Sequence, residues 1–98
     1  MALFAVLAKK APVGISSEEF ARLLSDGFNY TKELEDKGVI KHRWICVGAN
    51  AGLNVYEVDS HEQLMGVLYD SPAGPHLDFV VYPLIDPTSF DPTAAGRG

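Results

Sequence analysis

The sequence contains a single cysteine, so the chain cannot form an internal disulfide bond. Because disulfides belong to oxidising compartments, this scarcity suits the reducing cytoplasm, which is the location we expect. Long hydrophobic runs are missing too, and no stretch approaches the roughly 20 apolar residues that span a bilayer. Residues 1–8 are apolar but precede Lys9 and Lys10, which is the wrong order for a secretory signal. We therefore expect a strand there and no membrane partner.

Basic residues are also scarce. The 98 residues include 8 Lys and Arg against 13 Asp and Glu, which gives a net charge of −5. Nucleic acids and anionic lipid surfaces are recognised by a basic field, so this charge argues against both as partners. A chain of this length forms one domain with one modest core.

Metal and phosphate motifs are absent from the sequence. His42, His61 and His76 have no short ligand spacing to one another or to Cys46, whereas zinc sites use such spacings. The chain also has no glycine-rich phosphate loop and no nucleophile elbow. We therefore expect no metal site.

The pattern of apolar and turn-forming residues predicts a β-α-β-β-α-β order. Strands are predicted at residues 2–9, 39–47, 53–58 and 76–84. Helices are predicted from Ser16 to about Lys37, before a left-handed Gly38, and from Ser60 to about Tyr69, because both serines begin a capping-box spacing. Gly27, in the middle of the first helix, indicates close packing or a kink or, alternatively, space left for a ligand.

This order is typical of the α+β, ferredoxin-like βαββαβ fold. It forms a four-stranded antiparallel sheet with two helices on one face. The other face would be open to water and too apolar to stay exposed. We therefore predict a homodimer, in which two sheets face each other.

The C-terminal tail has no core pattern of its own. We predict a domain at residues 1–84 and a tail at residues 85–98 that contains two Asp-Pro pairs. The tail is either disordered or an arm laid across a partner subunit, with Phe90 as its anchor.

The strand between Gly38 and Gly48 carries the strongest candidates for chemistry. Alternation predicts two faces, one with Ile40, His42, Trp44 and Cys46 and the other with Lys41, Arg43, Ile45 and Val47. A neutral imidazole at His42 can exchange a proton near neutral pH, and Trp44 offers a wall for a flat organic substrate. The structural alternative is a hydrogen-bonded pair that only lines a barrel.

Other polar residues are weaker candidates. Lys41 or Arg43 would bind a substrate carboxylate, unless they are solvated or paired with Glu33 and Asp36. Asp78, if enclosed in an apolar barrel, would have a raised pKa and could shuttle protons, although a solvent-facing acid is an equal alternative. Two tyrosines complete the predicted substrate site, namely Tyr30 and Tyr56.

Several of these residues together resemble a known family. The segments Lys32-Glu-Leu-Glu-Asp-Lys-Gly38, Lys41-His42-x-Trp44, Val47-Gly48 and Tyr56-Glu57-Val58, with a helix opening at Ser60, resemble muconolactone δ-isomerase over roughly residues 3–90. The resemblance implies a ferredoxin-like fold, dimeric α/β barrels that can assemble into decamers, and no cofactor. It also implies proton-transfer isomerisation of a carboxymethyl butenolide in aromatic catabolism.

The chain departs from the family pattern Trp-Arg-His-x-Trp-Arg. Ile40, Lys41 and Ile45 replace the first tryptophan and the two arginines. The first helix has Asp26 as its nearby acid, where the family carries an acid and a lysine.

We therefore keep three hypotheses, with the isomerase first. The second is a cyclase, rearrangement enzyme or cofactor-less oxygenase of secondary metabolism, and the third is a non-catalytic ligand-binding or assembly protein.

Overall fold

The computed structural model describes residues 1–11 and 14–95. Four strands form in the predicted order with two long helices: β1 (Ala2–Lys10), α1 (Ser17–Asp36), β2 (Ile40–Cys46), β3 (Ala51–Val58), α2 (His61–Asp70) and β4 (Leu77–Leu84). Shorter helical turns follow α2 and β4, namely η1 (Gly74–His76), η2 (Pro87–Ser89) and α3 (Pro92–Ala95). Residues 12–13, which fall between the first predicted strand and the first predicted helix, and the last three residues of the predicted tail lie outside the described residues.

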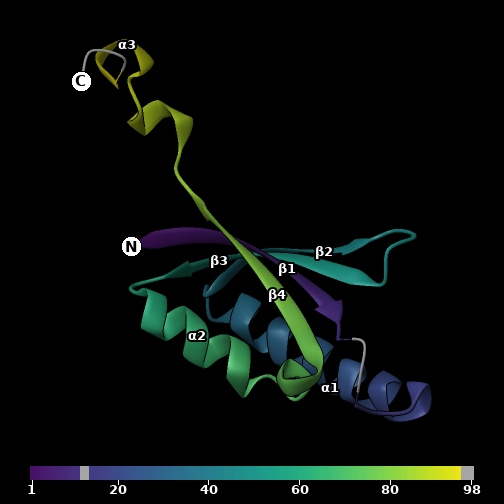
Figure 1. The fold of residues 1–98 in the computed structure, drawn as a ribbon. Helices are drawn as coiled ribbons and strands as arrows, with labels where there is room; N and C mark the ends of the chain where they lie inside the picture. The colour runs from purple at the N-terminus through teal and green to yellow at the C-terminus, as the bar shows by residue number, and fades with distance from the viewer. Residues whose placement is uncertain (12–13, 96–98) are drawn as a thin grey trace.

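The four strands form one antiparallel sheet in the order β2-β3-β1-β4. Helices α1 and α2 both lie on one side of this sheet (Figure 1). This confirms the predicted α+β, ferredoxin-like arrangement. The central position of β1 agrees with its apolar residues on both faces. The edge position of β4 agrees with Pro83, since proline cannot donate a hydrogen bond to a neighbouring strand.

Residue chemistry explains where both helices begin and where α1 ends. The Ser16 hydroxyl accepts a hydrogen bond from the Glu19 backbone N–H at 3.2 Å, and the Ser60 hydroxyl accepts one from Gln63 at 3.0 Å. Such caps satisfy backbone donors that the first turn leaves free. After α1, Gly38 adopts a φ of 80°, a left-handed conformation that favours glycine and turns the chain back towards the sheet.

The core lies between the helices and the covered face of the sheet. Val6 and Ile40 are each 1% exposed, so they are the most completely enclosed of its branched side chains. Burying side chains of this size contributes about 1.5–3 kcal/mol each to folding. The buried core residues come from every strand but β4: Phe4, Val6, Leu34, Ile40, Tyr56, Val58, Leu64 and Leu68.

The opposite face of the sheet has no helix over it within the described residues. Its side chains alternate with those of the core, as the strand registers show. Most of them are apolar, and Trp44 and Tyr82 are each 52% exposed. We call this surface the open face; it includes Leu3, Ala5, Leu7, Trp44, Leu53, Val55, Val80, Tyr82 and Leu84.

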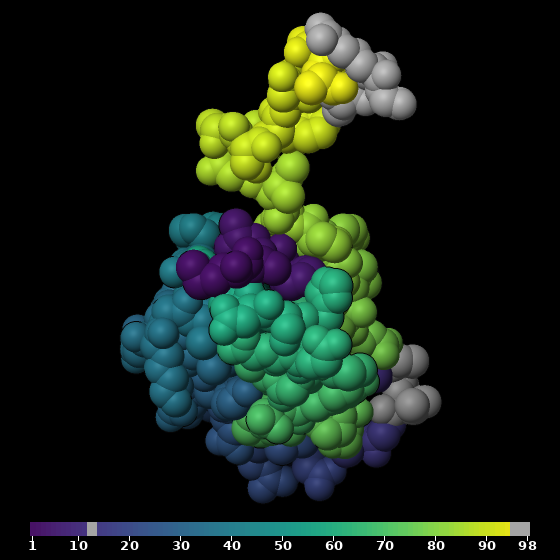
Figure 2. All heavy atoms as spheres, turned by 90° about the vertical axis from the view of Figure 1, so that its left-hand side faces the viewer, coloured from purple at the N-terminus to yellow at the C-terminus, as the bar shows by residue number. Residues whose placement is uncertain are grey.

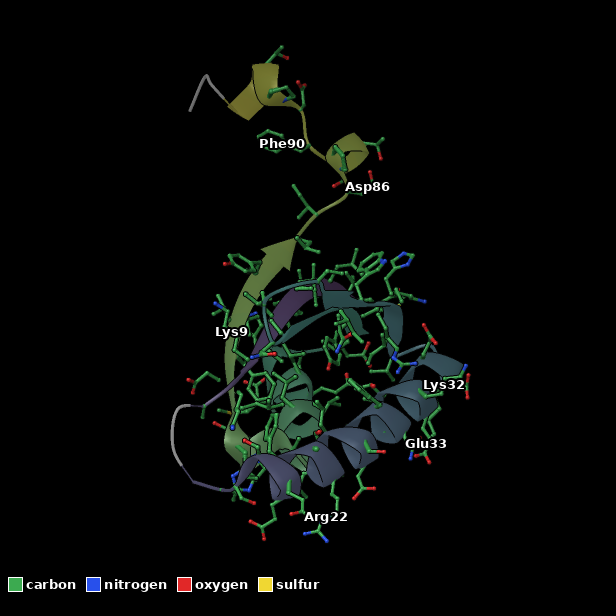
Figure 3. All side chains as sticks on the ribbon, turned by 90° about the vertical axis from the view of Figure 1, so that its right-hand side faces the viewer. Lys9, Arg22, Lys32, Glu33, Asp86 and Phe90 are labelled. Carbon is green, nitrogen blue, oxygen red and sulfur yellow. The ribbon has the colours of Figure 1, made fainter. Side chains whose placement is uncertain are left out.

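Beyond Leu84 the chain leaves the body of the fold. Figures 1 and 2 show residues 85–95 standing clear of the sheet and both helices. Asp86 and Phe90 lie on this segment, far from the labelled Lys32 and Glu33 on α1 (Figure 3). We call residues 85–95 the C-terminal arm. Its two short turns, η2 and α3, are structure that the sequence pattern did not predict.

Two packing details clarify the sequence predictions for α1. A Cβ atom built on Gly27 would lie 3.6 Å from both the Ala73 Cβ and the Ser71 Oγ. The loop after α2 therefore occupies the space beside Gly27, which supports close packing over ligand space. Tyr30 also packs against the core. Among the described residues, no helix combines the length and apolar character needed to cross a membrane.

Candidate functional site

A β-bulge in β2 reorganises the residues that carry the candidate chemistry. Ile40 pairs with Tyr56 and His42 pairs with Val55, so Lys41 is an extra residue in the ladder. The expected alternation is therefore wrong at the start of the strand. The extra residue in a bulge reverses which face of the sheet the preceding residues occupy relative to the following ones. Ile40 points into the core instead of sharing a face with His42.

His42 and Trp44 stack on the open face. Their ring centroids are 5.0 Å apart and their planes differ by 14°. His42 lies beside Val55 and Trp44 beside Leu53, so the pair continues onto the apolar surface of β3. His42 and Trp44 therefore share one face of the strand, as alternation predicts, and their roles in proton exchange and substrate contact stay predictions. Both side chains are exposed in a single chain.

Lys41 also reaches the open face, through the bulge. Its Nζ lies 3.2 Å from an Oε2 atom of Glu57, which projects from β3 on the side opposite Tyr56 and Val58. The Glu57 side chain is 21% exposed and that of Lys41 is 43% exposed. The open face therefore combines an acid, a cation and an imidazole at one end of β2. Alternation along β3 puts Glu57 on the same face as Leu53 and Val55, and the pairing of β2 with β3 brings it beside Lys41.

Arg43 points the other way, towards α1. Its Nη2 donates to the Phe28 carbonyl oxygen at 3.2 Å, and its Nη1 lies 3.6 Å from Glu35 Oε1. One predicted alternative is that a cation of this strand pairs with an acid of the first helix. Arg43 does so, but its partner is Glu35 and not Glu33 or Asp36. Arg43 thus holds β2 against α1 and does not join the open-face group.

The two predicted tyrosines belong to the covered face. Tyr30 donates its hydroxyl hydrogen to the Val67 carbonyl oxygen at 2.7 Å. Burial raises the pKa of Tyr30, and the nearby Asp70 carboxylate raises it further. Burial also raises the pKa of Tyr56, with a smaller contribution from Tyr30. Both phenols therefore stay neutral at physiological pH, and the sheet separates them from His42.

Asp78 lies on the open face but far from His42 within one chain. It pairs with Lys9 on β1, and its strand is the edge strand opposite β2. Three strand spacings, about 14 Å, separate the two edges. Asp78 is exposed, so a single chain does not enclose it in an apolar environment.

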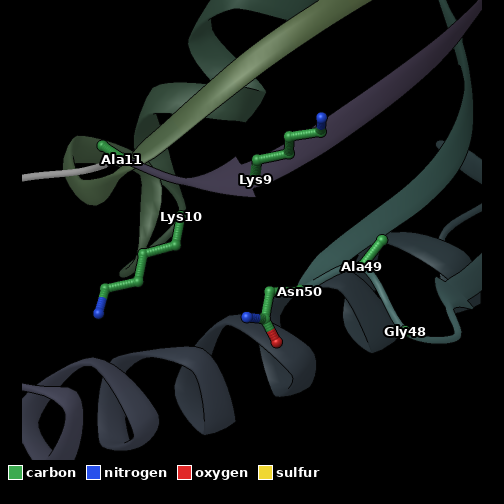
Figure 4. Close-up of a pocket in the computed structure, with 6 residues that line it drawn as sticks. All are labelled: Lys9, Lys10, Ala11, Gly48, Ala49 and Asn50. Atoms are coloured by element: carbon green, nitrogen blue, oxygen red, sulfur yellow. The ribbon is translucent and has the colours of Figure 1, made fainter.

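Two hollows on the surface of the described residues have linings that include neither His42 nor Trp44. The first, of about 420 Å³, lies where the end of β1 meets the β2–β3 turn (Figure 4). Figure 4 shows Lys9 and Lys10 extending in different directions, and the Lys10 Nζ sits 5.2 Å from the centre of the Phe20 ring. The second hollow, between α2 and β4, is described below. Within residues 1–11 and 14–95, no three acidic, His or Cys side chains gather where they could hold a metal ion.

Comparison with known proteins finds relatives over most of the chain. The family model for muconolactone delta-isomerase matches residues 2–89. Muconolactone Delta-isomerase 2 of Acinetobacter lwoffii is 34% identical over 70 residues, which cover 71% of this chain and 73% of that protein. Muconolactone Delta-isomerase of Acinetobacter baylyi is 26% identical over 73 residues, which cover 74% of this chain and 76% of that protein.

Two solved structures are similar as well. A crystal structure of muconolactone isomerase matches with a TM-score of 0.75 and 30% identity, over 91% of this chain and 95% of that chain. The 5-chloro-2-hydroxyhydroquinone dehydrochlorinase of Burkholderia phenoliruptrix AC1100, in complex with 2,5-dihydroxybenzoquinone, matches with a TM-score of 0.65. Its identity is 14%, over 91% of this chain and 99% of that chain, so this second likeness concerns the fold alone.

Proposed function

The chain belongs to the muconolactone delta-isomerase family, and we propose that it shifts a double bond in a small unsaturated lactone by proton transfer through His42. The observation that carries the proposal is the stacked His42–Trp44 pair on the open face. No other described histidine combines a proton-exchanging group with a flat aromatic wall in this way. The reaction needs no redox partner, because one C–H bond breaks, another forms and the electrons stay in the substrate.

In the proposed reaction, neutral His42 removes a proton from one carbon of the lactone ring. The electron pair delocalises through the conjugated system onto the lactone carbonyl oxygen. The imidazolium then returns a proton to a different ring carbon, and the double bond has moved. General acid–base groups of this kind contribute about 100-fold to 10,000-fold to the rate.

The neighbours of His42 have separate roles in this proposal. Trp44 supports the flat ring of the substrate, and the Lys41 ammonium binds its carboxylate. Glu57 holds Lys41 near the imidazole through the 3.2 Å ion pair. Asp78, Tyr56 and Tyr30 have no role in proton transfer within one chain, because the fold sets them apart from His42.

A second copy of the chain completes the proposed site. Trp44, Tyr82, Val80 and Leu84 are 38–52% exposed on one apolar surface, and monomers rarely leave a large surface of this kind in water. The family is oligomeric. Two open faces packed together in a homodimer would exclude water from His42 and strengthen its interaction with the developing charge. Dimers would then assemble further, up to the decamer that the family resemblance implies.

One observation favours a different reaction on the same scaffold. Lys41 is already paired with Glu57, and Arg43 is held by α1. Both cations of the strand therefore have partners within the chain, which favours a less anionic substrate. The corresponding reactions are a cyclisation, a rearrangement or a cofactor-less oxygenation.

Incubation with muconolactone tests the two proposals. The isomerase proposal predicts a change in ultraviolet absorbance as the double bond leaves conjugation, with turnover in proportion to enzyme. It predicts the same rate after exhaustive treatment with a chelator. Absence of turnover by the intact oligomer would overturn the isomerase proposal and favour the second one. A muconolactone that binds without reacting would instead indicate a ligand-binding protein.

A further inference from the structure

A second hollow lies between α2 and the helix-facing side of β4. It has a volume of about 370 Å³ and is almost entirely apolar, with His61 and Tyr69 as its polar members. On its rim, Met65 is 57% exposed and Tyr69 is 61% exposed. In Figure 2, α2 faces the viewer beside β4, and the arm stands away from both. We call this depression the α2–β4 hollow; it is lined by Phe4, His61, Leu64, Met65, Leu68, Tyr69, Phe79 and Val81.

The C-terminal arm has the complementary character. Ile85 is 66% exposed and Phe90 is 51% exposed, so the arm presents an aliphatic and an aromatic side chain to water. Within residues 85–95, neither of these side chains packs on the core. The arm has exposed apolar side chains, and the hollow is an apolar depression large enough to receive a side chain.

Two repeated turns give the arm a defined shape without help from the body. The Asp86 Oδ1 accepts hydrogen bonds from the Thr88 N–H at 2.9 Å and from its hydroxyl at 2.7 Å. The Asp91 Oδ1 accepts the same two bonds from Thr93 at 3.0 and 2.6 Å. Phe90 lies between these Asp-Pro-Thr turns. A preformed segment loses less conformational freedom on docking than a disordered one.

The arm leaves the body in a direction that its own sequence fixes. Pro83 and Pro87 bracket the exit from β4, and a residue before proline is held extended. Asp86 has the corresponding φ of −70° and ψ of 128°. In Figure 1 the segment after β4 runs away from the sheet and both helices. The arm therefore projects outward and does not fold back onto its own α2.

We infer that the arm of one copy inserts Phe90 into the α2–β4 hollow of a second copy. Because every copy carries both the arm and the hollow, the contact can be exchanged between partners. The hollow lies on the helix side of the sheet, so this contact is separate from the proposed pairing of open faces. It would link copies in addition to that pairing, and it does not depend on the proposed reaction.

Disulfide trapping between copies tests the inference. Cys46→Ser first removes the native thiol, and Ser89→Cys and Met65→Cys are then introduced into separate chains that are co-expressed. We expect a covalent dimer on mild oxidation of the mixture, and none from either variant alone. A chain that carries both Ser89→Cys and Met65→Cys is also oxidised. If its disulfide forms only within one chain and never between chains, the inference is overturned. Absence of any cross-link would overturn it as well.

A substitution at the anchor provides the second measurement. Phe90→Asp in the Ser89→Cys chain should abolish the covalent dimer, because a carboxylate cannot enter an apolar hollow without loss of hydration. Ala94→Asp adds the same charge one turn further along the arm and should leave the cross-link intact. Equal cross-linking by the Phe90→Asp and Ala94→Asp chains would contradict the anchor role.

Discussion

The Lys41 ammonium nitrogen lies 3.2 Å from a Glu57 carboxylate oxygen on the open face of the sheet. This contact exists because the β-bulge inserts Lys41 between Ile40 and His42. In an unbroken strand the alternation would place Lys41 and His42 on opposite sides of the sheet. The bulge thus gathers a cation, an acid and an imidazole on one side, where the proposed chemistry occurs.

Replacing Lys41 tests whether it binds a substrate anion. Lys41→Met keeps most of the apolar stem and removes the charge, so we expect KM for an anionic lactone to rise about tenfold. The value of kcat should change little, because an ion pair to the substrate carboxylate is present equally in the bound substrate and in the transition state. Steady-state kinetics at fixed ionic strength provide the measurement.

Arg43→Met is the matched control on the other side of the sheet. It removes a cation two residues away, but one that contacts Phe28 and Glu35. We expect an unchanged KM and a fall of about 1 kcal/mol in the free energy of unfolding, since the pair is partly exposed to solvent. A similar rise of KM in both variants would indicate a general charge effect and contradict the role of Lys41.

Gly27→Ala should stabilise the protein. Its new Cβ would meet Ala73 and Ser71 at 3.6 Å, which is ordinary van der Waals contact. Alanine is about 0.8–1.0 kcal/mol better than glycine inside a helix. We therefore expect the free energy of unfolding to rise by up to about 1 kcal/mol, as measured by denaturant unfolding at matched protein concentration.

Gly74→Ala makes the contrasting change close by. A Cβ there would lie 2.6 Å from the Leu68 carbonyl oxygen, and this neighbour is backbone. The last turn of α2 would have to move, so we expect a loss of about 1–3 kcal/mol. If Gly27→Ala were as destabilising as Gly74→Ala, the described packing of α1 on the loop would be incorrect.

The buried phenol of Tyr56 predicts a loss of stability in alkali. Its pKa is raised in the folded protein, chiefly by burial. Below the unfolded pKa of about 10, the phenol is neutral in both states and its contribution is fully present. Above that pH the unfolded chain ionises first and binds fewer protons, so stability falls as pH rises through the folded pKa.

Tyr56→Phe should therefore weaken this alkaline decline. Urea unfolding across the alkaline range measures it, and tyrosinate absorbance follows the phenol directly. Tyr69→Phe removes an exposed phenol instead and serves as the control. An unchanged decline in Tyr56→Phe would show that other groups govern alkaline unfolding.

Much of the fold follows from local sequence chemistry. Ser16 and Ser60 begin the helices as their capping spacings predict, and Gly38 ends α1 in a left-handed conformation. The strands predicted at residues 2–9 and 76–84 also form, as β1 and β4. These features depend on neighbours in the sequence, which is why a single sequence can predict them.

The candidate site depends on contacts between distant segments, and there the sequence is less informative. Nothing local marks Lys41 as a bulge, because the extra residue is defined only by the pairing of β2 with β3. Tyr56 and His42 were predicted in one site, but the sheet separates them. The partner of Glu57 likewise follows only from the register of β2 on β3.

Isomerisation in deuterated water is the most direct test of the central claim that His42 transfers the proton. The native enzyme should introduce deuterium at the carbon that receives the proton, and His42→Ala should lower both turnover and exchange by at least about 100-fold. His61→Ala, which changes a histidine beside Phe4 on the covered face, should retain both. Undiminished exchange in His42→Ala would contradict the account.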